Sequence, residues 1–249
     1  MNPHSEKLSP PSIDITFDFR TDTPPGRDPD AFSPTLRRYH KLLWSKPLPC
    51  GARFELDDTI PKSYLHHRSE AGEFFLSSDA VIPAFRKNSR ISKFRELRPV
   101  EEELGAFTKV EYTIGGMMIF PGNRIDGKAT INGARGFHPR IKDRFDLTLE
   151  CIRRHYCGEC SPLSDTLARY EDFFRLFGDF RGYVGFFLLQ DFVTNDCSMV
   201  KFMVPFDDFS QSPIPASDEA YIAYLRLAVN LTEVRNRRIL DSGLTVINE

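Results

Sequence analysis

The sequence predicts an α+β fold, with N-terminal antiparallel sheet elements followed by a mostly helical C-terminal half. Short apolar runs and alternating apolar residues, which are typical of strands, are concentrated before residue 132. Apolar residues at helical spacing dominate from residue 139 onward. Strands that precede the helices, instead of alternating with them, are typical of the α+β class.

The N-terminal half contains most of the predicted strands. Ile13, Ile15, Phe17 and Phe19 alternate with polar residues, as in a half-buried strand. A helix is expected over Thr35–Trp44, because Pro47 follows as a stop signal. Further expected elements are strands at 50–56 and within 64–76, a short helix capped by Ser77 or Ser78, and a hairpin pairing 113–120 with 128–131.

Helical patterns dominate the C-terminal half. The clearest helix is expected over 139–156, where apolar residues recur every three or four positions. Ser217 is a suitable cap for a long final helix, and Asp218 and Glu219 suit its positive end. The remaining expected elements are a helix over 164–177, a helix or helix–strand pair over 181–193, and a strand over 198–205.

The overall composition is that of an ordinary globular protein. Its 249 residues are 41% hydrophobic and carry a net charge of -2. One domain is common at this length, so we expect a disordered tail over 1–12 and a single domain over 13–249. The small net charge excludes a strong overall attraction to nucleic acid or to anionic membranes.

The chain contains no recognisable export or membrane segment. Residues 1–12 are polar and contain three prolines, unlike a signal peptide. The longest apolar run, 184–189, is too short to cross a bilayer. Five cysteines in such a chain are expected to be reduced thiols. We therefore expect a cytoplasmic protein without a membrane partner.

The segment 132–140 has the parts of an anion site. Two glycines allow the backbone to turn its N–H groups outward, and a helix is expected to begin directly after it. Basic side chains on it and on the preceding hairpin loop are candidate phosphate ligands: Arg124, Arg135, His138 and Arg140. The alternative is a tight loop whose arginines pair with Asp143, Asp146 or surface acids.

Glu150 and Arg154 are spaced i,i+4 on the side of the 139–156 helix that lies opposite its main apolar stripe. Leu147 on the same side predicts that this side is also covered, which would bury the ion pair. Such a pair is either a structural clamp or part of a binding site, with Glu150 and Arg154 orienting the groups that contact the ligand.

Two histidines are candidates for acid–base catalysis. His40 lies in a basic helix, and His66 precedes a serine-containing segment. Each is equally compatible with a capping or core role. A group of possible zinc ligands is compatible with ordinary thiols instead, so we predict no metal site and assign no cofactor: Cys151, His155, Cys157 and Cys160.

Four strings resemble a bacterial family of uncharacterised proteins. They are DTPPGRDP at 22–29, SPTLRRYHKLLWSKPLP at 33–49, GGMMIFPG at 115–122 and DRFDLTLECIRRH at 143–155. The resemblance covers most of the chain and implies a bacterial intracellular protein. It implies no activity, so no functional residue is transferred from it.

Two classes of function follow from these patterns. The first is an enzyme or binder of a phosphorylated ligand, either a nucleotide or RNA, held at 132–140. The second is a non-catalytic interaction or regulatory module, such as part of a toxin or phage-defence system, with a homodimer formed through the phenylalanine-rich segment 173–192. A basic run at 86–98 also suggests nucleic-acid binding, but three glutamates at 101–103 follow it closely.

Overall fold

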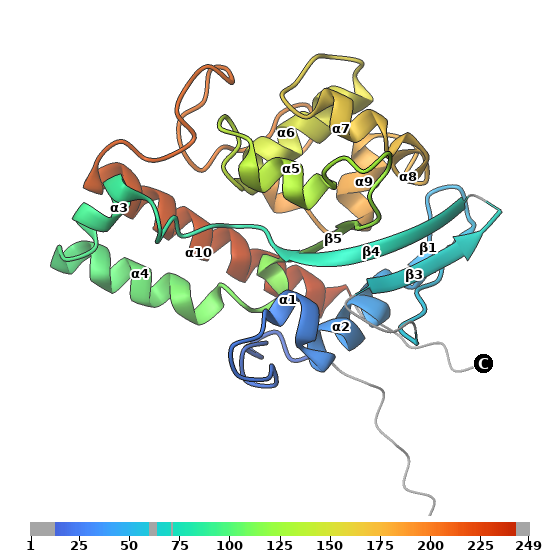
Figure 1. Ribbon diagram of the computed structural model, residues 1–249, viewed down its shortest axis with the longest axis horizontal. Helices are drawn as coiled ribbons and strands as arrows, with labels where there is room; N and C mark the ends of the chain where they lie inside the picture. Colours follow the sequence, from blue (N-terminus) through green and yellow to red (C-terminus); the bar gives the residue numbers. More distant parts are fainter. Residues whose placement is uncertain (1–12, 60–63, 71, 243–249) are drawn as a thin grey trace, which may run out of the picture.

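The computed structural model describes residues 13–59, 64–70 and 72–242. The tail predicted over 1–12 lies outside the described residues. The predicted fold class is confirmed: small antiparallel sheets lie in the N-terminal half, and the C-terminal half is mostly helical (Figure 1). None of the helices in the described ranges combines the length and apolarity needed to span a bilayer.

The main sheet has the strand order β3-β4-β5 and is antiparallel throughout. Strand β3 (Tyr64–Ser69) pairs with the first part of β4 (Gly72–Ala80), ending at Ser77. Strand β5 (Met117–Pro121) pairs with the second part, from Leu76 to Ala80. Beyond Ser77, therefore, no strand among the described residues pairs with this edge of β4. A small second sheet joins β1 (Lys46–Pro47) to β2 (Arg53–Phe54).

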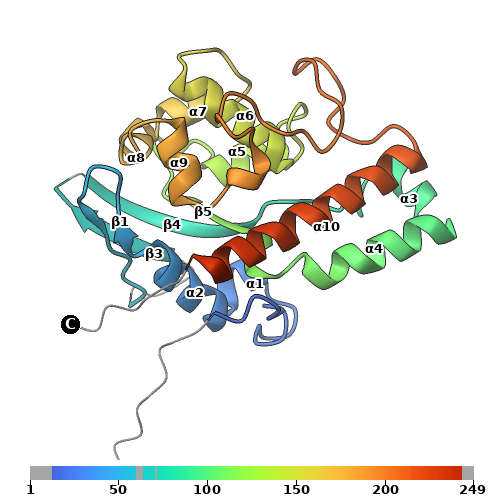
Figure 2. The ribbon, with the colours of Figure 1, turned by 180° about the vertical axis from the view of Figure 1, so that it is seen from behind.

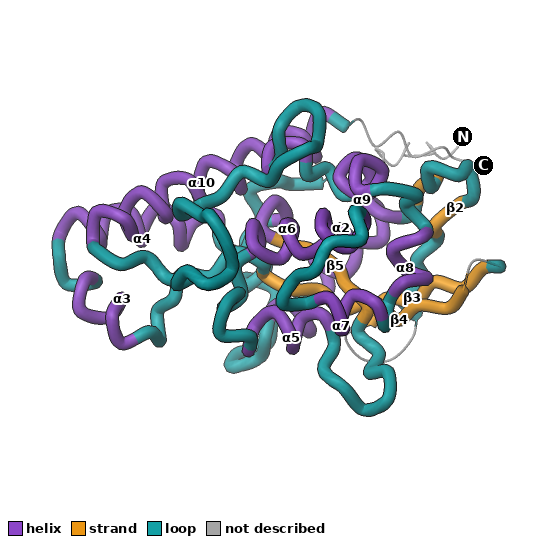
Figure 3. The backbone as a smooth tube through the Cα atoms, turned by 90° about the horizontal axis from the view of Figure 1, so that it is seen from above, coloured by secondary structure: helices purple, strands orange, loops and turns teal. Residues whose placement is uncertain are grey.

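Helices cover both faces of the main sheet (Figures 1 and 2). One face carries α5 (Ile131–Phe137), α6 (Phe145–Tyr156), α7 (Ser164–Ala168), α8 (Glu171–Arg175) and α9 (Phe180–Phe186). Two helices lie on the other side, α1 (Pro29–Phe32) and α2 (Pro34–Trp44). An elongated arm extends to one side and contains α3 (Ser89–Phe94), α4 (Arg98–Val110) and α10 (Asp218–Asp241), as Figure 3 also shows.

The arm is joined to the sheet at the 3-10 turn η1 (Ile114–Gly116), which packs on α10. Gly115 donates its backbone N–H to the Asn236 side chain at 2.6 Å. A Cβ atom at Gly115 would lie 2.3 Å from the Thr232 carbonyl oxygen, so only glycine permits this approach. The Gly115-Gly116 pair therefore sets how closely the long helix can pack against the start of β5.

The aromatic segment 173–192 is buried within the chain itself. It contributes the fully or almost fully covered residues Phe173, Phe174, Phe177, Tyr183, Phe187 and Phe192, and includes the 3-10 turn η2 (Gln190–Phe192). These rings contact each other at centroid separations such as 5.2 Å between Phe173 and Phe177. The aromatic segment therefore serves as core, and the predicted homodimer stays a prediction.

Several predicted elements are wrong. The predicted strand at 13–19 is a series of turns, and 128–131 is not a strand, because β4 occupies the edge of β5 instead. Ser77 and Ser78 belong to β4 and cap no helix. The predicted strand at 198–205 is reduced to one bridge, between Val193 and Val200. The expected helices over 164–177 and 181–193 are each divided into two short pieces.

The segment 132–140, expected as a loop, is mostly helix α5. Thr130 accepts the N–H of Gly133 and so caps this helix, which outweighs the low helix propensity of the two glycines. The next helix begins at Phe145 and not at Pro139, because Lys142 and Asp143 adopt positive φ angles of 47° and 69°. The final helix and its Ser217 cap are confirmed.

Candidate functional site

Arg135 organises a polar cluster between α5, the end of β4 and the turn before α6. Its side chain is 0% exposed, and all three guanidinium nitrogens donate to acceptors. The Nε–H donates to Thr148 at 3.1 Å, and Nη1 contacts the carboxylates of Asp79 at 2.5 Å and Asp143 at 2.6 Å. Nη2 donates to the carbonyls of Val81 and Asp143. Arg135 is thus a buried clamp with no donor left for a phosphate.

Asp30 from α1 approaches the same end of β4 from the open edge of the strand. Its Oδ2 accepts the N–H of Ala80 at 3.1 Å, which satisfies a donor that lacks a partner strand. Its Oδ1 is buried, and no residue in the described ranges bonds to it. A buried carboxylate oxygen without a donor is costly, so it favours a protonated carboxyl group at this position.

The carboxyl groups of Asp30 and Asp79 both have raised pKa values, and the charge of Asp79 acts on Asp30. Burial raises the pKa of Asp30, and the nearby charges of Asp79 and Asp28 raise it further. Burial also raises the pKa of Asp79; Arg135 opposes this rise, and the charge of Asp143 adds to it. Together, these effects let the pair retain a proton at a pH where ordinary carboxyl groups are ionised. The Asp79 side chain is 22% exposed, so this member of the pair reaches solvent.

His40, a predicted acid–base candidate, lies just behind the pair. The indole N–H of Trp44 donates to His40 Nδ1 at 3.0 Å, and His40 Nε2 lies 2.9 Å from the hydroxyl of Ser78. Because an indole can only donate, the ring proton of His40 belongs on Nε2 and is directed at Ser78. Burial, and secondarily the charge of Arg235, lower the pKa of His40 to about 3. This geometry favours a neutral, positioning histidine over a general base.

Ser78 connects His40 to the carboxyl pair. Its hydroxyl accepts the Nε2–H of His40, and it lies near enough to Asp30 to lower the pKa of that carboxyl group. A cavity of about 20 Å³ lies beside these groups, with Asp30, Ser33, His40 and Ser78 among its lining residues. That volume is enough for one water molecule. A hydrogen-bonded line therefore runs from Trp44 through His40 to Ser78, which borders the same cavity as Asp30.

Backbone strain occurs at the same cluster. Lys142 and Asp143 both adopt the left-handed region, which is uncommon outside glycine and costs on the order of 1 kcal/mol per residue. The Asp143 N–H donates to the Arg135 carbonyl at 3.0 Å, and Arg135 also bonds the Asp143 carbonyl, which holds the turn in place. Raised carboxyl pKa values, a buried carboxyl oxygen without a donor and local strain thus coincide, as they often do at functional sites.

The four predicted phosphate ligands do not meet at one point. Arg135 is internal, and its pairing with Asp143 matches the alternative reading of this segment. Arg124 is exposed in the loop that leads to the N-terminal end of α5. His138 and the exposed Arg140 follow the C-terminal end of α5. Burial and the charge of Arg140 lower the pKa of His138.

The remaining predicted site residues lie in separate contacts. Glu150 is 5% exposed and accepts from Arg154 at 2.7 Å and from Arg153 at 2.8 Å, so the predicted buried ion pair has a second arginine. His66 on β3 bonds Glu73 at 2.8 Å. All five cysteines are free, and the described residues contain no group of three or more metal-ligating side chains.

Sequence reasoning missed Asp30, Ser78 and Asp79. Asp30 lies in a loop-like stretch rich in Pro and Asp, where an acid is expected to cap a turn, as its neighbour Asp28 does at α1. Asp79 is 56 residues from Arg135, and no local pattern connects two positions so far apart. The only local signal was the polar Ser-Ser-Asp string at 77–79, next to an apolar stretch.

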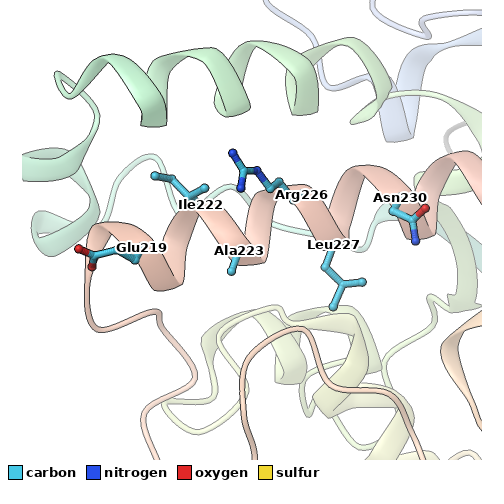
Figure 4. Close-up of a pocket in the computed structure, with 6 residues that line it drawn as sticks. All are labelled: Glu219, Ile222, Ala223, Arg226, Leu227 and Asn230. Carbon is cyan, nitrogen blue, oxygen red and sulfur yellow. The ribbon is translucent and has the colours of Figure 1, made fainter.

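A groove of about 660 Å³ runs along α10 in the arm, away from this cluster (Figure 4). Its lining residues all come from that one helix: Glu219, Ile222, Ala223, Arg226, Leu227 and Asn230. Arg226 is directed at α4, where it bonds Glu103 at 2.7 Å. The groove is open and contains no converging polar groups, so the buried cluster at Arg135 is the better candidate site.

A model of the family of unknown function DUF6994 matches residues 13–239. The match covers well over half of the 249 residues. The chain therefore belongs to this family, in agreement with the resemblance to an uncharacterised family. No curated protein and no solved structure matches the chain.

Proposed function

We propose that this member of the family is an enzyme that uses the carboxyl pair of Asp30 and Asp79 for general acid–base catalysis. The observation that carries the proposal is a pair of half-buried carboxyl groups within electrostatic range of each other, one of them with a buried oxygen that lacks a donor among the described residues. Two neighbouring carboxyl groups with raised pKa values can supply an acid and a base at one site. A surface ion pair would have neither raised carboxyl pKa values nor a buried oxygen without a donor.

The two members of the pair have different roles in this proposal. Asp79 reaches solvent and transfers a proton to or from the substrate. Asp30, which lies deeper in the protein, exchanges a proton with Asp79. The Ala80 N–H orients Asp30, His40 positions Ser78 beside it, and Arg135 fixes Asp79 in its rotamer. Hydrolysis suits this arrangement, because it needs one group to activate water and one to protonate the leaving group.

The second candidate is a phosphorylated ligand, either a nucleotide or RNA, as the substrate that binds beside the pair. Arg140 and Lys142 favour it: both are exposed, and neither forms an ion pair with any described residue. Lys142 directly precedes Asp143, which shares Arg135 with Asp79. A phosphate on this turn would therefore lie close to the exposed carboxyl group of Asp79.

A substrate panel tests both candidates. It contains nucleotides, short RNA, phosphate monoesters, glycosides and carboxylic esters. We expect turnover of a phosphorylated member, a 10²–10⁴-fold loss of kcat in Asp79→Asn, and a raised KM in Arg140→Ala. Because the pair must hold a proton, kcat should fall as the pH rises through the raised pKa.

Asp172→Asn is the matched control, because Asp172 is an exposed aspartate with 76% of its side chain accessible. This control should retain the wild-type rate. Turnover that is equal in wild type and Asp79→Asn, or a panel without any turnover, contradicts the catalytic proposal. Turnover confined to uncharged substrates contradicts only the phosphorylated ligand.

A further inference from the structure

Arg235 on α10 is a buried cation that has no acid partner. Its side chain is 0% exposed, and it takes part in no ion pair among the described residues. Nη1 donates to the carbonyls of Gly115 at 2.9 Å and Met117 at 2.8 Å. Nη2 contacts the Phe187 carbonyl and the Met118 sulfur, each at 3.1 Å. Carbonyl dipoles satisfy these donors but do not neutralise the charge.

Two donors in this part of the core have no acceptor. The Nε–H of Arg235 and the hydroxyl of Tyr183 are both buried, and neither bonds to a residue in the described ranges. Tyr183 comes from α9 and is 0% exposed. Both groups adjoin Phe187: the Tyr183 and Phe187 ring centroids are 4.9 Å apart, and the Phe187 carbonyl accepts from Arg235. Leaving two such donors unsatisfied is costly, and a shared acceptor would remove that cost.

The charge around Arg235 selects the kind of acceptor. Lys46 is a second cation within electrostatic range: its ammonium donates to the Phe186 carbonyl at 2.5 Å and lies 4.7 Å from the Phe186 ring centroid. Burial and Arg235 lower the pKa of Lys46 to about 8. Asp191, the acid whose charge acts on Arg235, is already bonded by both Nε and Nη2 of Arg238, at 2.7 and 2.8 Å. The region therefore has an excess of positive charge.

We propose that the Nε–H of Arg235 and the hydroxyl of Tyr183 bind a small monovalent anion, with chloride as the physiological ligand. An anion accepts from both donors and neutralises part of the buried positive charge. A water molecule could accept from both donors but would leave the charge unneutralised. Because Arg235 also holds Gly115, Met117 and Phe187, the anion would couple α9, α10 and the start of β5. Its binding should stabilise the fold as a whole.

Bromide replaces chloride in such sites and is visible by anomalous scattering. Crystals of the full chain grown in sodium bromide should show an anomalous peak within hydrogen-bond distance of Arg235 Nε and Tyr183 Oη. In solution, the Tm in sodium chloride should exceed that in sodium gluconate at equal ionic strength. The difference should reach roughly 5–10 °C when chloride is at about 100 times its Kd.

Variants separate this site from general salt effects. Tyr183→Phe removes one donor and should reduce the chloride-dependent shift in Tm. Tyr156→Phe is the matched control, because the Tyr156 hydroxyl already donates to the Phe174 carbonyl at 2.7 Å. It should keep the full shift. The proposal is overturned by equal Tm values in chloride and gluconate, or by a water without anomalous signal between Arg235 and Tyr183, where it could donate to the buried Gln190 oxygen.

Discussion

Replacing Arg135 with methionine is expected to lower the free energy of unfolding by about 3–5 kcal/mol, because it removes one partner of a buried ion-pair cluster. The carboxylates of Asp79 and Asp143 would lose their common cation, and the carbonyl of Val81 would lose its donor. Methionine fills most of the volume of the arginine side chain. The loss of stability therefore measures the missing polar contacts more than the cost of a cavity. Equilibrium unfolding in urea measures it, with the m-value checked for constancy.

A second substitution shows whether the uncompensated charge causes this loss. Adding Asp79→Asn to Arg135→Met should restore part of the stability, because the buried charge is removed with its partner. Arg98→Met is the control, since the Arg98 guanidinium is 88% exposed and pairs with Glu102 on the surface. An Arg135→Met protein as stable as Arg98→Met would contradict the role of Arg135 as a clamp.

Asp146→Asn is expected to cost about 3–5 kcal/mol for a related reason: it leaves a buried arginine without its counter-ion. Asp146 is 0% exposed and Arg144 is 1% exposed. Arg144 Nε donates to Asp146 at 3.0 Å, and the Met203 N–H donates to the same carboxylate at 2.7 Å. In asparagine, an NH₂ group replaces one carboxylate oxygen. It would face the N–H groups of Arg144 or Met203 and could not accept a hydrogen bond from them.

This substitution should also loosen the segment that the pair holds. Arg144 bonds the Pro213 carbonyl at 3.1 Å, so the pair joins both Met203 and Pro213 to the first turn of α6. Hydrogen exchange at the Met203 amide should therefore accelerate before that of the α6 interior. A stability loss without faster exchange at Met203 would locate the effect elsewhere.

The parts of the fold that depend on local pattern were predictable. The final helix has its Ser217 cap, two acids in its first turn and an apolar pattern within one stretch of chain. The helix ending at Trp44 is equally local. In contrast, the partner of β5 is β4, about 40 residues earlier in the chain, and no nearby strand competes for its edge. Tertiary contacts decided that pairing.

The candidate site was less predictable than the fold. Sequence reasoning identified Arg135 and its alternative partner Asp143, and it selected His40 as a candidate. It could not place Asp30 at the end of β4, because the Asp30–Ala80 bond depends on where the described pairing of β3 with β4 stops. Burial also reversed the expected chemistry: Arg135 is a clamp, and Asp30 and Asp79 are the carboxyl groups with raised pKa values.

The most direct test of the carboxyl pair is a ¹³C NMR titration of the aspartate side chains, with Asp30→Asn used to assign the pair. Asp30 and Asp79 are expected to titrate well above the ordinary aspartate value of about 4. In Asp79→Asn, the pKa of Asp30 should fall, because a repelling charge has been removed. Two carboxyl groups that both titrate near 4, and an Asp30 that does not respond to Asp79→Asn, would contradict a shared acid–base site.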